Sequence, residues 1–104
     1  MSKGNENWGL RLKEARLSAG LSQKQLGIQA GLDEFVASPR INRYELGIHK
    51  ADYQTVQRLS DVLNIPTGYF YTEEDSLAEL MLIYHRLTSK KKMELLKVAK
   101  SLQS

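Results

Sequence analysis

Apolar side chains recur every three or four residues along most of this chain, which is the spacing of one face of a helix. The clearest run predicts a helix from about Trp8 to Ala19, ended by Gly20. Its apolar positions are Trp8, Leu12, Ala15 and Ala19. A second helix should span about Gln23 to Ala30 and end at Gly31, because glycine accepts the positive φ of such a turn.

Two helix-start signals lie within residues 22–39. Ser22 and Gln25 form a capping box, in which the serine hydroxyl accepts from the N–H of Gln25 and the glutamine side chain reaches back. Ser38 followed by Pro39 is a second start, because proline needs no N–H at the first helical position. The two signals predict a pair of short helices, the second over residues 38–46.

The middle of the chain continues the helical pattern. Asp52 is expected to cap a helix from about Tyr53 to Leu63, and Pro66 prevents its continuation. Residues 67–71, TGYFY, should form one short helical turn whose aromatic side chains close the core. These side chains are Tyr69, Phe70 and Tyr71.

The C-terminal third predicts two more helices. Thr72 should cap the first, which runs to about Leu87 and is apolar on every side at residues 80–84. A small core cannot surround such a helix, so we expect a subunit interface, formed by Leu80, Met81, Ile83, Tyr84 and Leu87. The last helix should run from Lys90 or Lys91 to Leu102. Its expected inward positions are Met93, Leu96, Val98 and Ala99.

The composition narrows the class of protein. At 104 residues, the chain should form one domain with a helical appendage. It has no cysteine, which excludes disulfides and thiolate metal sites and suits a reducing cytoplasm. No apolar run approaches the roughly 20 residues that span a bilayer, and the first residues lack a signal-peptide core. The net charge of +3 permits nucleic-acid binding without arguing for it.

The polar positions of the 38–46 helix carry the candidate chemistry. They are Arg40, Asn42 and Arg43, the residue types that pair with guanine, adenine and phosphate. Two capped helices joined by a bend, with such side chains outward, indicate a DNA-binding helix-turn-helix. The alternative is that all three are ordinary solvated residues of an amphipathic helix.

Three sequence segments carry a family resemblance. They are LRLKEARLSAGLSQKQLG, the pattern Ile41-x-x-Tyr44-Glu45-x-Gly47, and ADYQTVQRLSDVLNIP. In this order they resemble the lambda-repressor and Cro-like (XRE) helix-turn-helix family, over roughly Trp8 to Phe70. The resemblance implies an all-α fold, a lambda-repressor-like five-helix DNA-binding domain with a C-terminal helical extension. It also implies a sequence-specific transcriptional regulator, with repression as the expected role.

We accordingly divide the chain into three parts. Residues 1–7 are expected to be a flexible tail, 8–71 the DNA-binding domain, and 72–104 a dimerisation element. The segment LDEFVAS, between Gly31 and the second helix start, is about four residues longer than the turn usual in the resembled family. We expect residues 33–37 to form an extra helical turn, with Phe35 or Val36 tucked into the core.

The resemblance also assigns roles to individual residues. It implies an ion pair between Arg16 and Glu45 that ties the first helix to the end of the recognition helix; alternatively, Arg16 is merely solvated. Base reading falls to Arg40, Asn42 and Arg43. Phosphate contacts are expected near the start of the second helix and after the third, from Ser22, Gln23, Lys24, His49 and Lys50.

Other chemistry finds little support in the sequence. His49 and His85 are far apart and have no second ligand at metal-binding spacing, so we expect no metal and no cofactor. The lysines at 90–92 are more typical of a solvated helix end than of a DNA contact. The serines lack a histidine–acid partner set, and no glycine-rich phosphate loop is present, so we expect no enzyme.

Two hypotheses of function follow. The first is a cytoplasmic regulator that binds a near-palindromic operator in double-stranded DNA as a homodimer. The second is an adaptor of the same fold whose main partner is another protein, held on the apolar segment at residues 80–84. An antitoxin, which represses transcription and also binds a toxin, combines the two.

Overall fold

The computed structural model describes residues 3–103 of the chain. Within them every regular element is helical: α1 (Lys3–Ser18), α2 (Gln23–Gln29), α3 (Glu34–Glu45), α4 (Tyr53–Leu63), the 3₁₀ helix η1 (Thr67–Tyr71), α5 (Asp75–Arg86) and α6 (Ser89–Ser101). The all-α prediction is confirmed, and the order of the helices is the predicted one.

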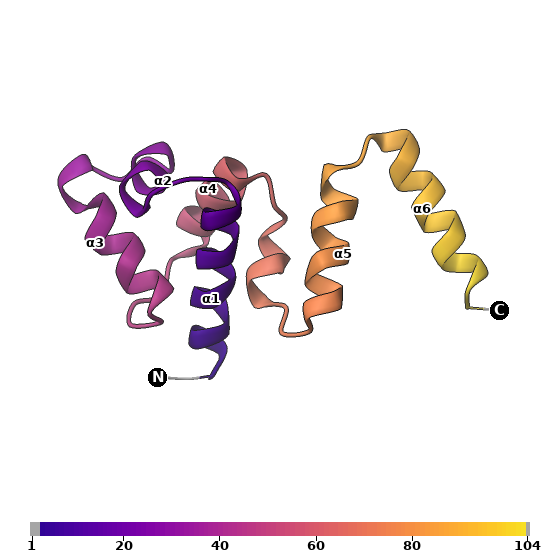
Figure 1. Cartoon of the computed structure of the whole chain (residues 1–104), viewed down its shortest axis with the longest axis horizontal. Coiled ribbons are helices and arrows are strands. Elements are labelled where there is room, and N and C mark those ends of the chain that lie inside the picture. The colour runs from indigo at the N-terminus through magenta and orange to yellow at the C-terminus, as the bar shows by residue number, and fades with distance from the viewer. Residues whose placement is uncertain (1–2, 104) are drawn as a thin grey trace.

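The helices are arranged along an elongated molecule of 52 × 28 × 22 Å. Figure 1 shows α1 to α4 gathered at one end, with η1 and α5 beside them and α6 at the far end. One continuous core lies among α1, α2, α3, α4 and η1, with Ala78 as the contribution from α5. Its fully buried large side chains are Leu12, Leu26, Ile41, Val56, Leu59 and Phe70.

Aromatic rings close this core on the side of η1. The ring centroid of Trp8 lies 4.9 Å from that of Phe70 and 6.2 Å from that of Tyr44, which it meets edge-on. Tyr69 is buried beside Phe70, as predicted, but Tyr71 is 60% exposed. The prediction for Tyr71 was wrong because three consecutive side chains of a helix cannot all face the same neighbour.

The first helix begins earlier than the sequence indicated. α1 starts at Lys3, so residues 3–7, expected in a tail, are helical; residues 1 and 2 lie outside the described residues. Glu6 lies in the first turn, where the helix dipole favours an acid, and the side-chain amide of Asn7 donates to the carbonyl of Thr72 at 3.4 Å. These interactions extend the helix beyond its apolar stripe.

The third helix also begins earlier, at Glu34 rather than at Ser38. Asp33 is its N-cap, with a carboxylate oxygen that accepts from the N–H of Phe35 at 2.9 Å. Pro39 lies inside the helix, where its missing N–H removes one bond, to the carbonyl of Phe35. Because Phe35 lies at the exposed end of α3, water can replace that bond. The extra turn therefore continues α3 instead of preceding it.

The extra turn does not bury the residue we expected. Phe35 is 85% exposed and Val36 is 40% exposed, whereas Ala37 is fully buried. A Cβ atom added to Gly27 of α2 would lie 2.7 Å from the Cβ of Ala37, so the two helices touch at their smallest side chains. This close contact leaves no room for a phenylalanine between them.

The start of α5 differs from the prediction that Thr72 caps it. The helix begins at Asp75, after Glu74, and the hydroxyl of Thr72 instead donates to the carbonyl of Gly68 in η1 at 2.8 Å. The Arg11 Nε of α1 donates to the Thr72 carbonyl at 2.9 Å. These bonds hold residues 72–74 as a connection and delay the helix.

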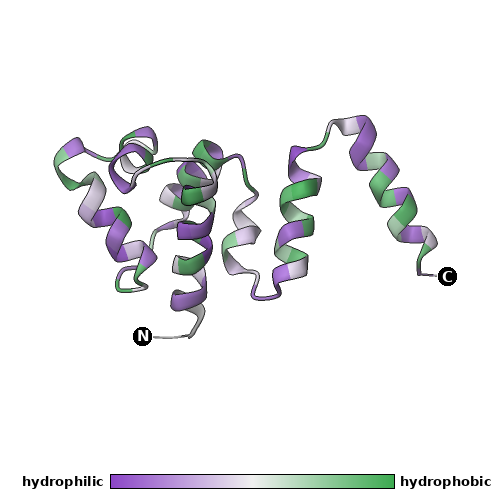
Figure 2. Ribbon diagram, viewed as in Figure 1, coloured by the Kyte–Doolittle hydropathy of each residue, from purple (hydrophilic) through white to green (hydrophobic). Residues whose placement is uncertain are grey.

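The last helix makes little contact with the rest of the chain. None of its residues is buried, so the predicted inward face of α6 is wrong: Met93 is 74% exposed and Val98 56%. Figure 2 shows apolar residues along both α5 and α6. On α5, Ala78 is buried in the core, whereas Leu80, Ile83 and Tyr84 are exposed. The predicted inward positions were Met93, Leu96, Val98 and Ala99.

The position of the α3 cap can be tested by a pair of substitutions. Asp33→Ala should lower the free energy of unfolding by about 1 kcal/mol, because it removes the cap of α3. Ser38→Ala should change it by less than about 0.5 kcal/mol. Urea unfolding followed by circular dichroism measures both; a larger loss for Ser38→Ala would place the helix start at Ser38.

Candidate nucleic-acid interface

The helix pair α2–α3 is joined by a tight turn. Ser22 caps α2 with the complete capping box: its hydroxyl accepts from Gln25 N–H at 3.0 Å, and its own N–H donates to the Gln25 side chain at 2.8 Å. Gly31, with φ of +91°, ends the helix. The contact between Gly27 and Ala37 then sets α3 directly against α2.

The outward face of α3 carries the predicted reading residues. Its inward face is formed by Ala37, Ile41, Tyr44 and Glu45. Asn42 and Arg43 are exposed on the opposite side, as the rotation of about 100° per residue requires. Arg40 is exposed at the edge of that face, where its charge helps to lower the pKa of Asp52, whose carboxylate is held mainly by hydrogen bonding to Thr55.

Gln23 connects α2 to this face. Its side-chain amide donates to the Asn42 side-chain oxygen at 3.1 Å and to the Glu45 carboxylate at 3.1 Å. Gln23 was predicted to contact phosphate; the structure also places it beside Asn42. The oxygen of Asn42 therefore already accepts one hydrogen bond, while its NH₂ group remains available as a donor.

A buried ion pair holds α3 against α1. Arg16 donates from Nε to Glu45 at 2.6 Å and from Nη2 to the other carboxylate oxygen at 3.0 Å, in a two-pronged arrangement. A third donor of Arg16 reaches the carbonyl of Leu21 at 3.0 Å. The two side chains are 9% and 3% exposed. This is the ion pair that the family resemblance implied.

The residues predicted to contact phosphate flank the outward face of α3 in sequence. Ser22 and Lys24 lie at the start of α2, and His49 and Lys50 follow α3; all four are exposed. The Ser22 hydroxyl acts as an acceptor in the capping box, which leaves its proton free to donate. Hydrogen-bond donors and two lysine charges therefore stand both before and after α3 in the sequence.

The comparisons with known proteins agree with this geometry. A family model described as helix-turn-helix matches residues 12–70, which is more than half of the chain and includes all of α2 and α3. The chain belongs to the helix-turn-helix family. The match confirms the resemblance to XRE-type regulators that the sequence carries.

Individual relatives of this helix-turn-helix protein are regulators by name. An uncharacterised HTH-type transcriptional regulator from Sinorhizobium medicae (strain WSM419) is 29% identical over 65 residues, 62% of this chain and 44% of that protein. A regulator of the same description from Rhizobium meliloti (strain 1021) matches equally. The chain thus spans less than half the length of these curated relatives.

A solved structure extends the similarity over nearly the whole chain. It is described as a crystal structure of the transcriptional regulator BswR and is 47% identical to this helix-turn-helix protein. The TM-score is 0.84, over 89% of this chain and 92% of that one. The similarity therefore reaches beyond the helix-turn-helix region.

The predicted interface residues of α5 lie apart from α3. Leu80, Ile83 and Tyr84 are between 42% and 48% exposed, and Met81 and Leu87 are half-buried. In Figure 1, α5 and α6 occupy the end of the molecule opposite to α3. The structure thus separates the candidate DNA-reading residues from the candidate interface.

Arg11 is a structural residue that the sequence did not single out. Its guanidinium donates to the carbonyls of Thr72 and Glu73 and to the carboxylate of Asp75 at 2.9 to 3.0 Å. Burial opposes its charge, but hydrogen bonds with Asp75 and Glu14 outweigh this and raise the pKa of Arg11. Nothing in the spacing of α1 distinguishes Arg11 from a solvated arginine, since its partners lie about sixty residues away.

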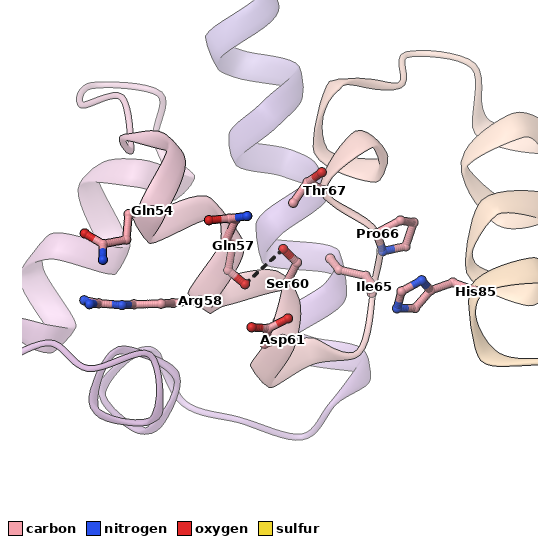
Figure 3. A pocket seen from close by; sticks show the side chains of 9 residues that line it. All are labelled: Gln54, Gln57, Arg58, Ser60, Asp61, Ile65, Pro66, Thr67 and His85. Carbon is pink, nitrogen blue, oxygen red and sulfur yellow. Dashed lines mark hydrogen bonds between the residues drawn. The ribbon is translucent and has the colours of Figure 1, made fainter.

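A polar pocket of about 430 Å³ lies between α4 and α5 (Figure 3). The hydroxyl of Ser60, one of its lining residues, is turned back to its own helix, where it donates to Val56 at 2.7 Å. Among the described residues, no buried side-chain nitrogen or oxygen lacks a partner. No buried side-chain polar atom of the pocket is therefore left without a hydrogen-bond partner. It is lined by Gln54, Gln57, Arg58, Ser60, Asp61, Ile65, Pro66, Thr67 and His85.

The described part of the chain lacks the features of a metal site and of a membrane span. It contains no group of three or more histidine, cysteine, aspartate or glutamate side chains that could hold a metal ion. None of its helices is long and apolar enough to cross a bilayer.

The ion pair predicts a large effect of a single truncation. Glu45→Ala should lower the free energy of unfolding by about 3–5 kcal/mol, because it leaves the buried Arg16 charge without a partner. Glu45→Gln keeps an acceptor and should cost less. Glu94→Ala, which removes an exposed acid on α6, is the control and should change stability by less than about 0.5 kcal/mol. An unchanged melting temperature for Glu45→Ala would show that the pair adds no stability.

Proposed function

We propose that this protein is a sequence-specific DNA-binding regulator of transcription, and that α3 is its recognition helix. The observation that carries the proposal is the outward face of α3, which exposes Asn42 and Arg43 while Glu45 of the same helix is held in a buried ion pair. A side chain can discriminate bases only if its backbone is held rigidly against the groove. The proposed activity is DNA binding and not catalysis. The proposed biological role is repression of transcription in the cytoplasm.

Base reading is proposed for the residues of this face. Arg43 is proposed to donate two hydrogen bonds to the O6 and N7 of a guanine. Asn42 contributes its NH₂ group as a donor, because its oxygen accepts from Gln23. Arg40, at the edge of the face, reaches either a base or the adjacent backbone.

Positioning on the DNA backbone is proposed for the flanking residues. The start of α2 offers the Ser22 hydroxyl, Lys24 and the positive end of the helix dipole to one phosphate. His49 and Lys50 offer donors to the backbone on the other side of α3. Each neutralised phosphate should add to a salt-dependent affinity that does not depend on sequence.

A second copy of the chain is proposed as the partner of α5 and α6. An apolar groove of about 390 Å³ runs between them, and none of the residues of α6 is buried. The groove is lined mainly by Leu77, Leu80, Met81, Tyr84, Leu95, Leu96 and Ala99.

The charges of the two helices favour this self-association. Helix α6 has five lysines and one glutamate, whereas the start of α5 and the residues before it are acidic. The α6 of one copy is thus complementary to the α5 of another. Two-fold symmetry would place two α3 helices in successive major grooves of a near-palindromic operator.

The same surface supports a second candidate function. A different protein, such as a toxin, would bind to the exposed apolar side chains of α5 at the same surface as a second copy of this chain. The oligomeric state separates the two functions, because a purified dimer has covered this surface already. A monomer that binds DNA weakly and captures a second protein would favour the adaptor.

The first test is selection of bound sequences from random duplex DNA, followed by titration with salt. We expect an inverted repeat with half-sites about one helical turn apart. Arg40→Ala with Arg43→Ala should lower specific affinity, since each base contact contributes about 1–3 kcal/mol. Lys13→Ala removes an exposed positive charge from α1 and should preserve the preference. If the Arg40/Arg43 variant kept its specific affinity, α3 would not be the reading helix.

Dimerisation is tested by placing charge on the exposed face of α5. Leu80→Glu with Ile83→Glu should convert a dimer to a monomer in sedimentation velocity and weaken operator binding by about 100-fold or more, because two linked half-site contacts become one. Leu17→Glu, on an exposed leucine of α1, is the matched control and should remain dimeric. A dimer that survives the α5 substitutions would place the interface elsewhere.

A further inference from the structure

The most exposed large apolar side chain among the described residues stands on the recognition helix. Phe35 is 85% exposed, in the first turn of α3. Val36 and Pro39 beside it are also exposed, so the N-terminal third of the helix presents an apolar surface. Moving the phenyl ring of Phe35 from water into an apolar contact would be favourable. No other part of the described chain covers the ring.

Helical geometry places Phe35 on the same face as the reading residues. Phe35, Pro39 and Arg43 follow one another at intervals of four residues, and Asn42 is seven residues after Phe35. Residues at these intervals lie along one side of a helix. The outward face of α3 is therefore apolar over its first turns and polar over its last, with Phe35 and Arg43 separated by about 12 Å along the axis.

The acidic residues of this turn do not stand in the way of DNA. Glu34 precedes Phe35 by one residue, so its position on the helix is rotated by about 100° from that of Phe35, and its side chain is exposed. Asp33 is the N-cap, and its carboxylate already accepts from the backbone of Phe35 at 2.9 Å. Neither acid therefore lies in the row that Phe35 forms with Pro39 and Arg43.

We propose that Phe35 is a specificity residue that packs its ring on the 5-methyl group of a thymine in each operator half-site. This inference rests on the proposed function of α3. The thymine methyl is the apolar group that the major groove exposes, and phenylalanine is one of the side chains that contact it. The N-terminal residues of a recognition helix are those that approach base edges. The additional turn of α3 is what brings Phe35 to this position.

The test removes the methyl group alone. Each thymine of the selected operator is replaced in turn by uracil, and binding is measured by fluorescence anisotropy for the wild-type protein and for Phe35→Ala. In the wild type, one thymine per half-site should cost about fourfold in affinity when its methyl is removed, the value of one buried methyl group. In Phe35→Ala, affinity for the thymine operator should fall, and the same replacement should cost nothing further.

Controls separate this contact from general effects. Tyr71→Ala removes an aromatic ring of 60% exposure from η1 and should retain the wild-type response to uracil. Because Phe35 is so exposed, Phe35→Ala should keep the wild-type melting temperature and remain able to bind. Loss of the uracil response in Phe35→Ala alone would support the proposal.

The other outcomes overturn it. If Phe35→Ala responds to uracil as the wild type does, at every thymine, while the Arg40/Arg43 variant loses specificity, this inference fails and the proposed function stands. If Phe35→Ala changes only the sedimentation behaviour, the ring belongs to a protein contact. If no operator is selected, both the proposed function and this inference fail.

Discussion

The buried ion pair between Arg16 and Glu45 is the interaction on which the arrangement of this molecule depends. It joins α1 to the last turn of α3, and through Gln23, which bonds to both Glu45 and Asn42, it includes α2 and the outward face of α3. A charge at this depth is stable only with its partner, so the three helices keep one relative position. A recognition helix needs this rigidity, because hydrogen bonds to base edges tolerate little displacement.

Close backbone approach reinforces the same arrangement. Gly27 of α2 rests on Ala37 of α3, and Gly9 of α1 rests on the carbonyl of Glu45, positions where a Cβ atom would collide. In the first turn of α3 it is the small Ala37 that faces α2, whereas the larger Phe35 and Val36 are exposed. The rule that places apolar side chains inside is thus overridden at a surface that we propose to be functional.

The two ends of the molecule differ in how they are held. The end with α2 and α3 is held by the ion pair and a continuous core, whereas α6 has no buried residue at all. Between them, α5 is fastened at both ends, by Arg11 to Asp75 and by Arg86 to the carbonyls of Leu63 and Asn64. An apolar surface that projects from a rigid support suits assembly, because it can be covered without disturbing the reading helix.

The sequence by itself determined most of the helices and the family, because capping boxes, apolar spacing and the Tyr44-Glu45-x-Gly47 segment are local signals. The Arg16–Glu45 pair joins residues 29 positions apart, and it was implied only by the family resemblance. The sequence did not determine where α3 begins, since Asp33 and Ser38 are both competent caps, and only the structure shows that Asp33 is the one used. It also missed the role of Arg11, whose partners are distant in sequence. Exposure of Phe35 and of α6 was likewise decided by the tertiary structure, because burial depends on which surfaces meet and not on periodicity alone.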